Sequence, residues 1–205
     1  MTDHNDGPAA EQARFAQAMA RFDQANAQDP STVEVEGQSV PSELLYARRM
    51  SQWLERFRPD APEALRLAAR AQHIQRWRIP RERYPRDRQG YHRWRNELKE
   101  FHATTAAAIL EEVGYPGQTV GRVAALLRKQ HLRDDAETQC LEDVICLVFL
   151  SHYFEAFAER HPPEKLDRIV RKTWAKMSPR ARETALAADL PERTREIVGR
   201  ALDGA

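Results

Sequence analysis

The chain has 205 residues, of which 32 are Lys or Arg and 31 are Asp or Glu, so its formal net charge is only +1. A charge this small excludes a protein that holds polyanions through its overall charge. Eight glycines in a chain rich in Ala, Leu, Arg and Glu favour helices over sheets. Because this length also suits one core, we predict a single all-α domain over residues 1–205.

Neither a signal peptide nor a membrane span is expected. The N-terminal segment is polar and acidic and lacks the basic and apolar regions of a signal peptide. The longest apolar run, Val144–Leu150, is too short to cross a bilayer. Cys140 and Cys146 stand six positions apart, which matches neither a metal site nor a disulfide framework. We therefore expect a cytoplasmic protein with two reduced, buried thiols.

Apolar residues at helical spacing predict the elements of the first half of the chain. The predicted helices cover residues 9–27, 42–57, 60–79 and 91–113. Between the first two, Val33–Val35 is expected to be extended. His73 falls on the apolar face of the third helix and His102 on that of the fourth, so both imidazoles are predicted to face the core.

The second half of the chain has the same helical character. Helices are predicted over residues 118–131, 139–160 and 163–177, and two short ones begin at Ser178-Pro179 and Leu190-Pro191. The helix over 139–160 is apolar nearly all round, which indicates a central, buried position. We predict a bundle of about eight helices. Its core covers about 43–160, an N-terminal helix and loop occupy 1–40, and C-terminal helices occupy 161–205.

Polar residues on the inner faces of these helices are the first candidates for a site. His73, His102 and His131 lie on inward faces of successive helices, and Glu142 and Asp143 open the most apolar helix. Imidazole and carboxylate ligands converging in a core suit Mn, Fe, Mg or Zn. The alternative is that the histidines are ordinary core residues and that the acids pair with arginines, since a buried carboxylate needs a partner in either case.

A basic, aromatic segment is the second candidate. Eleven Lys or Arg residues lie between Arg66 and Lys99, against three acidic residues. Arginine and aromatic side chains together are typical of sites that bind phosphate and stack on bases. The candidate stacking residues are Trp77, Tyr84, Tyr91 and Trp94. The candidate phosphate-binding residues are Arg70, Arg76, Arg81, Arg88, Arg95 and Lys99. A solvated segment whose arginines pair with acids elsewhere is the alternative.

Five stretches of the sequence resemble the HD superfamily of metal-dependent phosphohydrolases. They read, in order, ELLYARRMSQWLE, LAARAQHI, FHATTAAAILEEVGYP, VAALLRKQH and QCLEDVICLVFL. The resemblance implies an HD-like helical fold over about half the chain. By this likeness His73 matches the histidine of the His-Asp pair, His102 a later metal ligand and Asp143 the final aspartate. His131 lies near a further histidine of two-metal members.

Two positions depart from that superfamily. Tyr46 stands where its first histidine would be, and Ile74 where the paired aspartate would be. Four longer strings are instead very similar to one family, domain of unknown function 4202, over nearly the whole chain. They are RAQHIQRWRIPRERYP, GYHRWRNELKEFHA, ETQCLEDVICLVFLSHYF and KTWAKMS. The chain is therefore expected to be HD-like without the His-Asp pair.

Two functional hypotheses follow. The first is a metal-dependent phosphohydrolase for a nucleotide or another phosphorylated small molecule. Its metal would lie on His73, His102 and Asp143, and Glu142 or His131 would transfer protons. The second is a non-catalytic HD-like module, without a cofactor, that binds an anionic ligand or nucleic acid through the arginine and aromatic segment. No membrane partner is expected, and the sequence leaves a purely structural role open.

Overall fold

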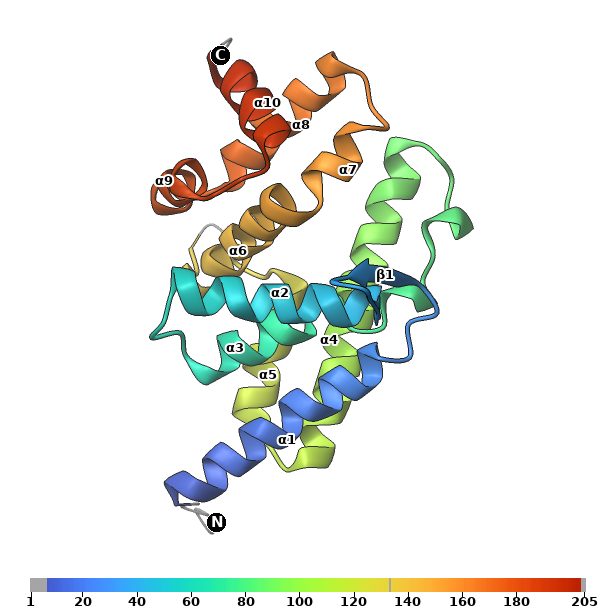
Figure 1. Cartoon of the computed structure of the whole chain (residues 1–205). Coiled ribbons are helices and arrows are strands. Elements are labelled where there is room, and N and C mark those ends of the chain that lie inside the picture. The colour runs from blue at the N-terminus through green and yellow to red at the C-terminus, as the bar shows by residue number, and fades with distance from the viewer. Residues whose placement is uncertain (1–6, 133, 204–205) are drawn as a thin grey trace. The chain divides into compact units, whose positions relative to one another are not determined.

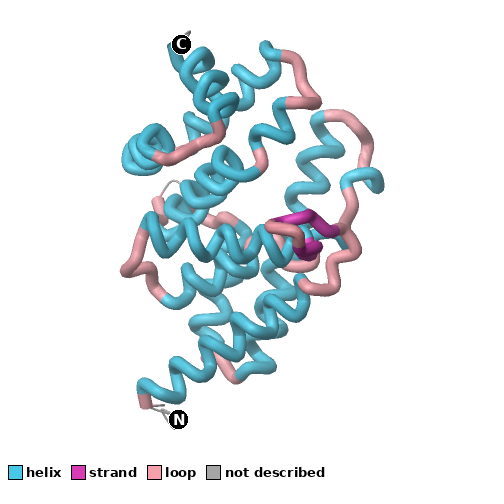
Figure 2. Tube along the Cα trace, in the orientation of Figure 1, coloured by secondary structure: helices cyan, strands magenta, loops and turns pink. Residues whose placement is uncertain are grey.

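The structure is a computed structural model that describes residues 7–132 and 134–203. Within these residues the chain forms ten α-helices, two short 3-10 helices and one two-stranded hairpin (Figure 2). The prediction of an all-α protein is confirmed. Among the described helices, none has the length and apolar character that crossing a membrane requires.

The chain divides into two compact units, and the first contains residues 1–51 and 60–130. Its described elements are α1 (Pro8–Asn26), β1 (Thr32–Val35), β2 (Gln38–Pro41), the first part of α2 (Ser42–Phe57), α3 (Glu63–Ala71), η1 (Arg76–Arg78), η2 (Arg81–Arg83), α4 (Arg88–Val113) and α5 (Gly117–Arg128). The long helix α4 packs against both α5 and α1, and α3 packs against α5 and α1 (Figure 1). This packing buries Leu65, Leu67, Leu110 and Leu126 completely.

Helix ends in this unit follow from local chemistry. The Asp87 carboxylate accepts a hydrogen bond from the Gly90 amide at 2.6 Å and so caps the start of α4. Gly114 ends the same helix with φ 87°, which glycine adopts without steric cost. The strands pair antiparallel with Val33 opposite Val40, so the extended piece predicted at Val33–Val35 is confirmed.

The second unit contains residues 52–59 and 131–205. Its described elements are the end of α2, then α6 (Ala136–His152), α7 (Phe154–Ala158), α8 (Pro163–Lys176), α9 (Pro179–Ala187) and α10 (Glu192–Asp203). Helix α6 is its buried centre, with Leu141, Val144 and Leu147 almost fully enclosed. Ser178 caps α9 by accepting a hydrogen bond from the Ala181 amide, at the start that Ser178-Pro179 predicts.

Three of the predicted helices were too long, and the expected number of about eight was too low. The helix predicted over 118–131 ends at Arg128, so His131 lies outside it. The helix predicted over 139–160 is interrupted at Tyr153, whose backbone leaves the helical region at φ −127°, and therefore counts as α6 and α7. The helix predicted over 60–79 stops at Ala71, so His73 lies in the turn that follows α3 and Trp77 lies in the 3-10 helix η1. The division into a single domain with a core over about 43–160 stays a prediction.

Candidate functional site

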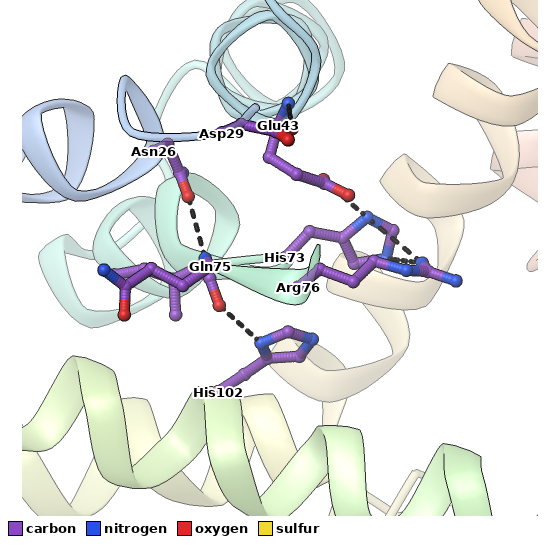
Figure 3. A network of polar contacts seen from close by, with 8 residues as sticks. Asn26, Asp29, Glu43, His73, Gln75, Arg76 and His102 are labelled. Carbon is purple, nitrogen blue, oxygen red and sulfur yellow. Dashed lines mark hydrogen bonds and ion pairs between the residues drawn. The ribbon is translucent and has the colours of Figure 1, made fainter. Parts of the chain in front are cut away.

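The chain turns sharply after α3, and this turn carries His73 and Arg76. Gln75 adopts the left-handed backbone region, with φ 49°, which costs free energy for a residue with a side chain. The backbone N–H of Gln75 donates a hydrogen bond of 2.9 Å to the side-chain oxygen of Asn26 (Figure 3). Asn26 is the last residue of α1 and is fully buried. A contact across 49 positions therefore holds the turn in place.

The His73 ring lies among three side chains that fix its orientation. Tyr46 stacks on it, with ring centroids 3.9 Å apart and planes 11° from parallel. Its Nε2 lies 3.0 Å from an Arg76 guanidinium nitrogen, and its Nδ1 lies 3.4 Å from a Glu43 carboxyl oxygen (Figure 3). The same Arg76 nitrogen lies 3.4 Å from Nδ1 and is thus closer to Nε2. Because a guanidinium only donates, the shorter contact favours Nε2 as the acceptor and the ring proton on Nδ1, toward Glu43.

Burial sets the charges of this group. Burial and the nearby cations Arg76, Arg95 and Lys129 hold the pKa of His73 well below its usual range, so its imidazole is neutral at neutral pH. Burial raises the pKa of Glu43 to about 7, although Arg76 opposes the change. The Glu43 amide donates a hydrogen bond of 2.9 Å to the buried Asp29 carboxylate, which fixes the start of α2. Glu43 thus gains and loses a proton near neutral pH, beside a His73 imidazole that stays neutral.

His102 on α4 supplies a second neutral imidazole. Its ring centroid lies 5.9 Å from that of His73, and its side chain is only 4% exposed. Its Nδ1 lies 2.9 Å from the Ile74 carbonyl oxygen, which can only accept, so Nδ1 carries the proton. Burial and the neighbouring His73 lower its pKa well below the usual range. Its Nε2 is buried and has no hydrogen-bond partner among the described residues.

These residues line a small pocket with a basic character, which we call the basic pocket. The residues around it are Gln72, His73, Arg76, Arg95, Leu98, Lys99, His102, Leu127 and Lys129. Gln72, Leu98, His102 and Leu127 are buried, whereas the four Arg and Lys residues are half-buried. Among these nine described residues none is acidic. Four cations beside two neutral imidazoles can attract an anion and donate hydrogen bonds to it.

The six predicted phosphate-binding residues divide into three groups. Arg76, Arg95 and Lys99 line the basic pocket. Arg70 instead donates two hydrogen bonds, of 2.7 and 2.6 Å, to Asp23, and Arg81 donates to the carbonyls of Tyr84 and Pro85. Arg88 is exposed at the start of α4. Half of the predicted set is therefore gathered at one place, and two further members have structural bonds.

The predicted stacking residues lie apart from the pocket lining. Trp94 is buried, donates its indole N–H to the Ile79 carbonyl at 2.9 Å, and has the Arg76 guanidinium 5.0 Å from its ring. The Trp94 ring therefore makes a cation–π contact within the protein, and this contact holds Arg76 in position. Trp77 and Tyr84 are half-buried, and Tyr91 is 46% exposed.

Asp143, Glu142 and His131 belong to the second unit. Asp143 is 2% exposed, and one of its carboxylate oxygens accepts hydrogen bonds from the Gln139 amide at 2.9 Å and the Ser178 backbone N–H at 2.8 Å. Glu142 lies 3.6 Å from the Lys176 ammonium. His131 is exposed, with φ 54°. In this unit Asp143 has a structural task, because it joins α6 to the start of α9.

The residues predicted to hold a metal are distributed over both units. Within the part of the chain that the structure describes, no group of three His, Cys, Asp or Glu side chains is arranged to hold a metal ion. In the first unit both ring nitrogens of His73 face protein groups, so only Nε2 of His102 is open. That donor set does not fit a divalent cation, which needs at least three protein ligands in most protein sites. A site on His73, His102 and Asp143 stays a prediction.

Lys129 and Gln72 are pocket residues that sequence reasoning missed. Lys129 follows the last residue of α5 with φ 57° and ψ 42°, a position that usually holds glycine, and its amide closes the helix end. A lysine in place of that glycine accepts backbone strain while adding charge to the pocket, a pattern common at functional sites. Lysine is common at helix ends, so the sequence position of Lys129 did not predict its place in the pocket.

Replacing Lys129 with glycine is therefore expected to stabilise the protein and to weaken anion binding. Relief of the left-handed strain should raise the free energy of unfolding by about 0.5–1 kcal/mol. Urea denaturation measures the gain. The matched control is Glu36→Gly in the hairpin turn, where φ is 52°. Glu36→Gly should raise the free energy of unfolding by a similar amount and leave anion binding unchanged. A lower free energy of unfolding for Lys129→Gly would contradict the inference that the Lys129 backbone is strained.

Comparison with known proteins adds one finding. The family model described as Domain of unknown function (DUF4202) matches residues 16–198, which include every residue of the basic pocket. A search of curated proteins and a search of solved structures each found no significant match.

Proposed function

Since the chain belongs to the DUF4202 family, whose description states no activity, we propose a function from the basic pocket itself: it binds a phosphorylated small molecule. The single observation that carries the proposal is the gathering of Arg76, Arg95, Lys99 and Lys129 around one pocket. A bound anion offsets the mutual repulsion of cations that lie this close together, so such a cluster favours anion binding. Phosphate oxygens match both guanidinium and ammonium donors.

Positions of the aromatic residues favour a small ligand over nucleic acid. A strand of nucleic acid needs exposed aromatic faces beside its cations. Of the predicted stacking residues that the structure describes, Tyr91 is exposed, whereas Trp94 is buried against Arg76. Arg81 donates to backbone carbonyls. The basic loop over residues 81–88 is therefore a weaker candidate than the pocket, although binding of nucleic acid through it stays a testable alternative.

Hydrolysis of the bound phosphate ester is a second candidate function. The observation in its favour is Glu43, whose carboxyl has a pKa of about 7 and lies 3.4 Å from Nδ1 of the pocket residue His73. Groups that gain and lose protons near neutral pH are suited to acid–base catalysis. The resemblance of five sequence stretches to metal-dependent phosphohydrolases favours the same reaction.

The experiment compares two double variants that remove the same charge. Arg95→Gln with Lys99→Gln changes the pocket, and Arg86→Gln with Arg88→Gln changes exposed residues of the basic loop. Titration calorimetry with propyl phosphate should show at least about tenfold weaker binding for the pocket variant, because each charge-assisted hydrogen bond contributes roughly 1.5–3 kcal/mol. The loop variant should bind within about twofold of the wild type.

Other outcomes would decide between the candidates. Absence of propyl phosphate binding by the wild type would overturn the proposal. Loss of single-stranded RNA binding in the loop variant alone would support the nucleic-acid alternative. Release of inorganic phosphate from a phosphate monoester, measured with and without Mn²⁺, tests hydrolysis in the same samples.

A further inference from the structure

Two buried acceptor atoms without partners lie among the residues of the basic pocket. One is Nε2 of His102 and the other is the side-chain oxygen of Gln72. Their side chains are 4% and 6% exposed. A buried polar atom without a hydrogen bond costs free energy, so native proteins nearly always provide a partner for it. The partner that these atoms lack must be a donor.

The His102 atom is an acceptor by necessity. Its other ring nitrogen faces the Ile74 carbonyl, which cannot donate, and burial keeps the ring neutral. A neutral imidazole with its proton on Nδ1 presents a lone pair at Nε2. Figure 3 shows this second nitrogen on the opposite side of the His102 ring from the bonded carbonyl. A fully ionised phosphate offers only acceptor oxygens and would be repelled there.

Burial separates the acceptors from the cations within the pocket. Gln72 and His102 are buried, whereas Arg76, Arg95, Lys99 and Lys129 are half-buried. The acceptors therefore lie at the inner end and the positive charges nearer to solvent. The free volume of the whole basic pocket is about 20 Å³, which suits one group of the size of water or a hydroxyl. The phosphate of a ligand would therefore lie at the mouth of the pocket, against the half-buried cations.

We infer that the ligand of the basic pocket is a phosphate monoester that also carries a hydroxyl group, as in a polyol or sugar phosphate. The hydroxyl enters the inner end and donates to Nε2 of His102 or to the Gln72 oxygen. The phosphate stays at the half-buried cations. This inference rests on the proposed function and adds the selectivity of the same pocket.

The test uses two ligands that differ in the hydroxyls. Glycerol 3-phosphate has two hydroxyls and propyl phosphate has none, with chains of the same length and the same phosphate. By titration calorimetry the wild type should bind glycerol 3-phosphate at least about tenfold more tightly, because the ligand without hydroxyls provides no donor for either buried acceptor. Glycerol alone should not compete, since it lacks the phosphate.

Two variants then assign the selectivity. Gln72→Leu removes one acceptor and His102→Phe removes the other, and in each the affinity ratio between the two phosphates should fall toward one. His102→Phe also loses the hydrogen bond to the Ile74 carbonyl, so circular dichroism is used to check that this variant folds. If it does not fold, the affinity ratio of the wild type for the two phosphates still tests the inference. Equal affinity of the wild type for both phosphates would overturn the inference and leave the proposed function standing. Binding of neither phosphate would overturn the proposed function.

Discussion

Replacing Asp143 with alanine is expected to lower the free energy of unfolding by about 3 kcal/mol, because two hydrogen bonds to a buried carboxylate are lost. The carboxylate is 2% exposed and accepts hydrogen bonds from Gln139 and from the backbone of Ser178. Ser178 is also the residue that caps α9. Without Asp143 its N–H loses its acceptor, and the connection between α8 and α9 is no longer tied to α6. Urea denaturation monitored by circular dichroism measures the change.

The same experiment separates a structural role of Asp143 from the predicted metal ligation. If the role is structural, Asp143→Ala should lose the same stability in the presence of a chelator as in the presence of Mn²⁺. Asp143→Asn, which keeps one oxygen for the two donors, should lose less. A wild type that falls to the stability of Asp143→Ala on adding chelator would instead support a metal on this carboxylate.

Replacing Glu43 with glutamine is expected to stabilise the protein by about 3 kcal/mol above pH 7 and to leave it unchanged near pH 4. The pKa of Glu43 rises from 4.5 to about 7 on folding, and its side chain is 17% exposed. The folded protein therefore holds a proton that the unfolded chain releases. Each unit of pKa difference corresponds to about 1.4 kcal/mol.

The sign of this pH dependence follows from proton linkage. The contribution of Glu43 is fully present below pH 4.5, falls as the pH rises and is lost above about pH 7. His73 and His102 act in the opposite direction, because their lowered pKa values remove stability as the pH falls below 6.5. The difference between wild type and variant cancels these histidine contributions and isolates Glu43.

Denaturation midpoints measured from pH 4 to pH 9 provide the check. The matched control is Glu55→Gln, an exposed carboxylate on the same helix α2, whose difference from the wild type should stay within about 0.5 kcal/mol at every pH. A constant difference for Glu43→Gln across this range would contradict the raised pKa.

Local patterns in the sequence were sufficient for most of the helices, because their starts and ends are encoded nearby. Ser42–Phe57 begins and ends where its flanking prolines indicate, and Ser178 caps α9 as expected. The end of α3 could not be predicted in this way. The turn at Gln75 depends on the Asn26 side chain, a partner from a different helix that no local pattern reveals.

The candidate site was predictable in composition and less so in arrangement. His73 and His102 were expected to face the interior, and they meet with ring centroids 5.9 Å apart. The sequence predicted six phosphate-binding residues and could not rank them. The fold places Arg76, Arg95 and Lys99 at the basic pocket, whereas Arg70 and Arg81 form hydrogen bonds within the protein. The contribution of Lys129 depends on a backbone conformation that its residue type disfavours.

The hydrogen bond between Asn26 and Gln75 also bears on the order of folding. The contacts between α4 and α5 join neighbouring segments of the chain, so they close short loops and are expected to form early. The Gln75 turn requires α1 to dock across 49 positions, which is a slower event. The basic pocket is therefore expected to be among the last features of the first unit to assemble, after most of the helices that support it.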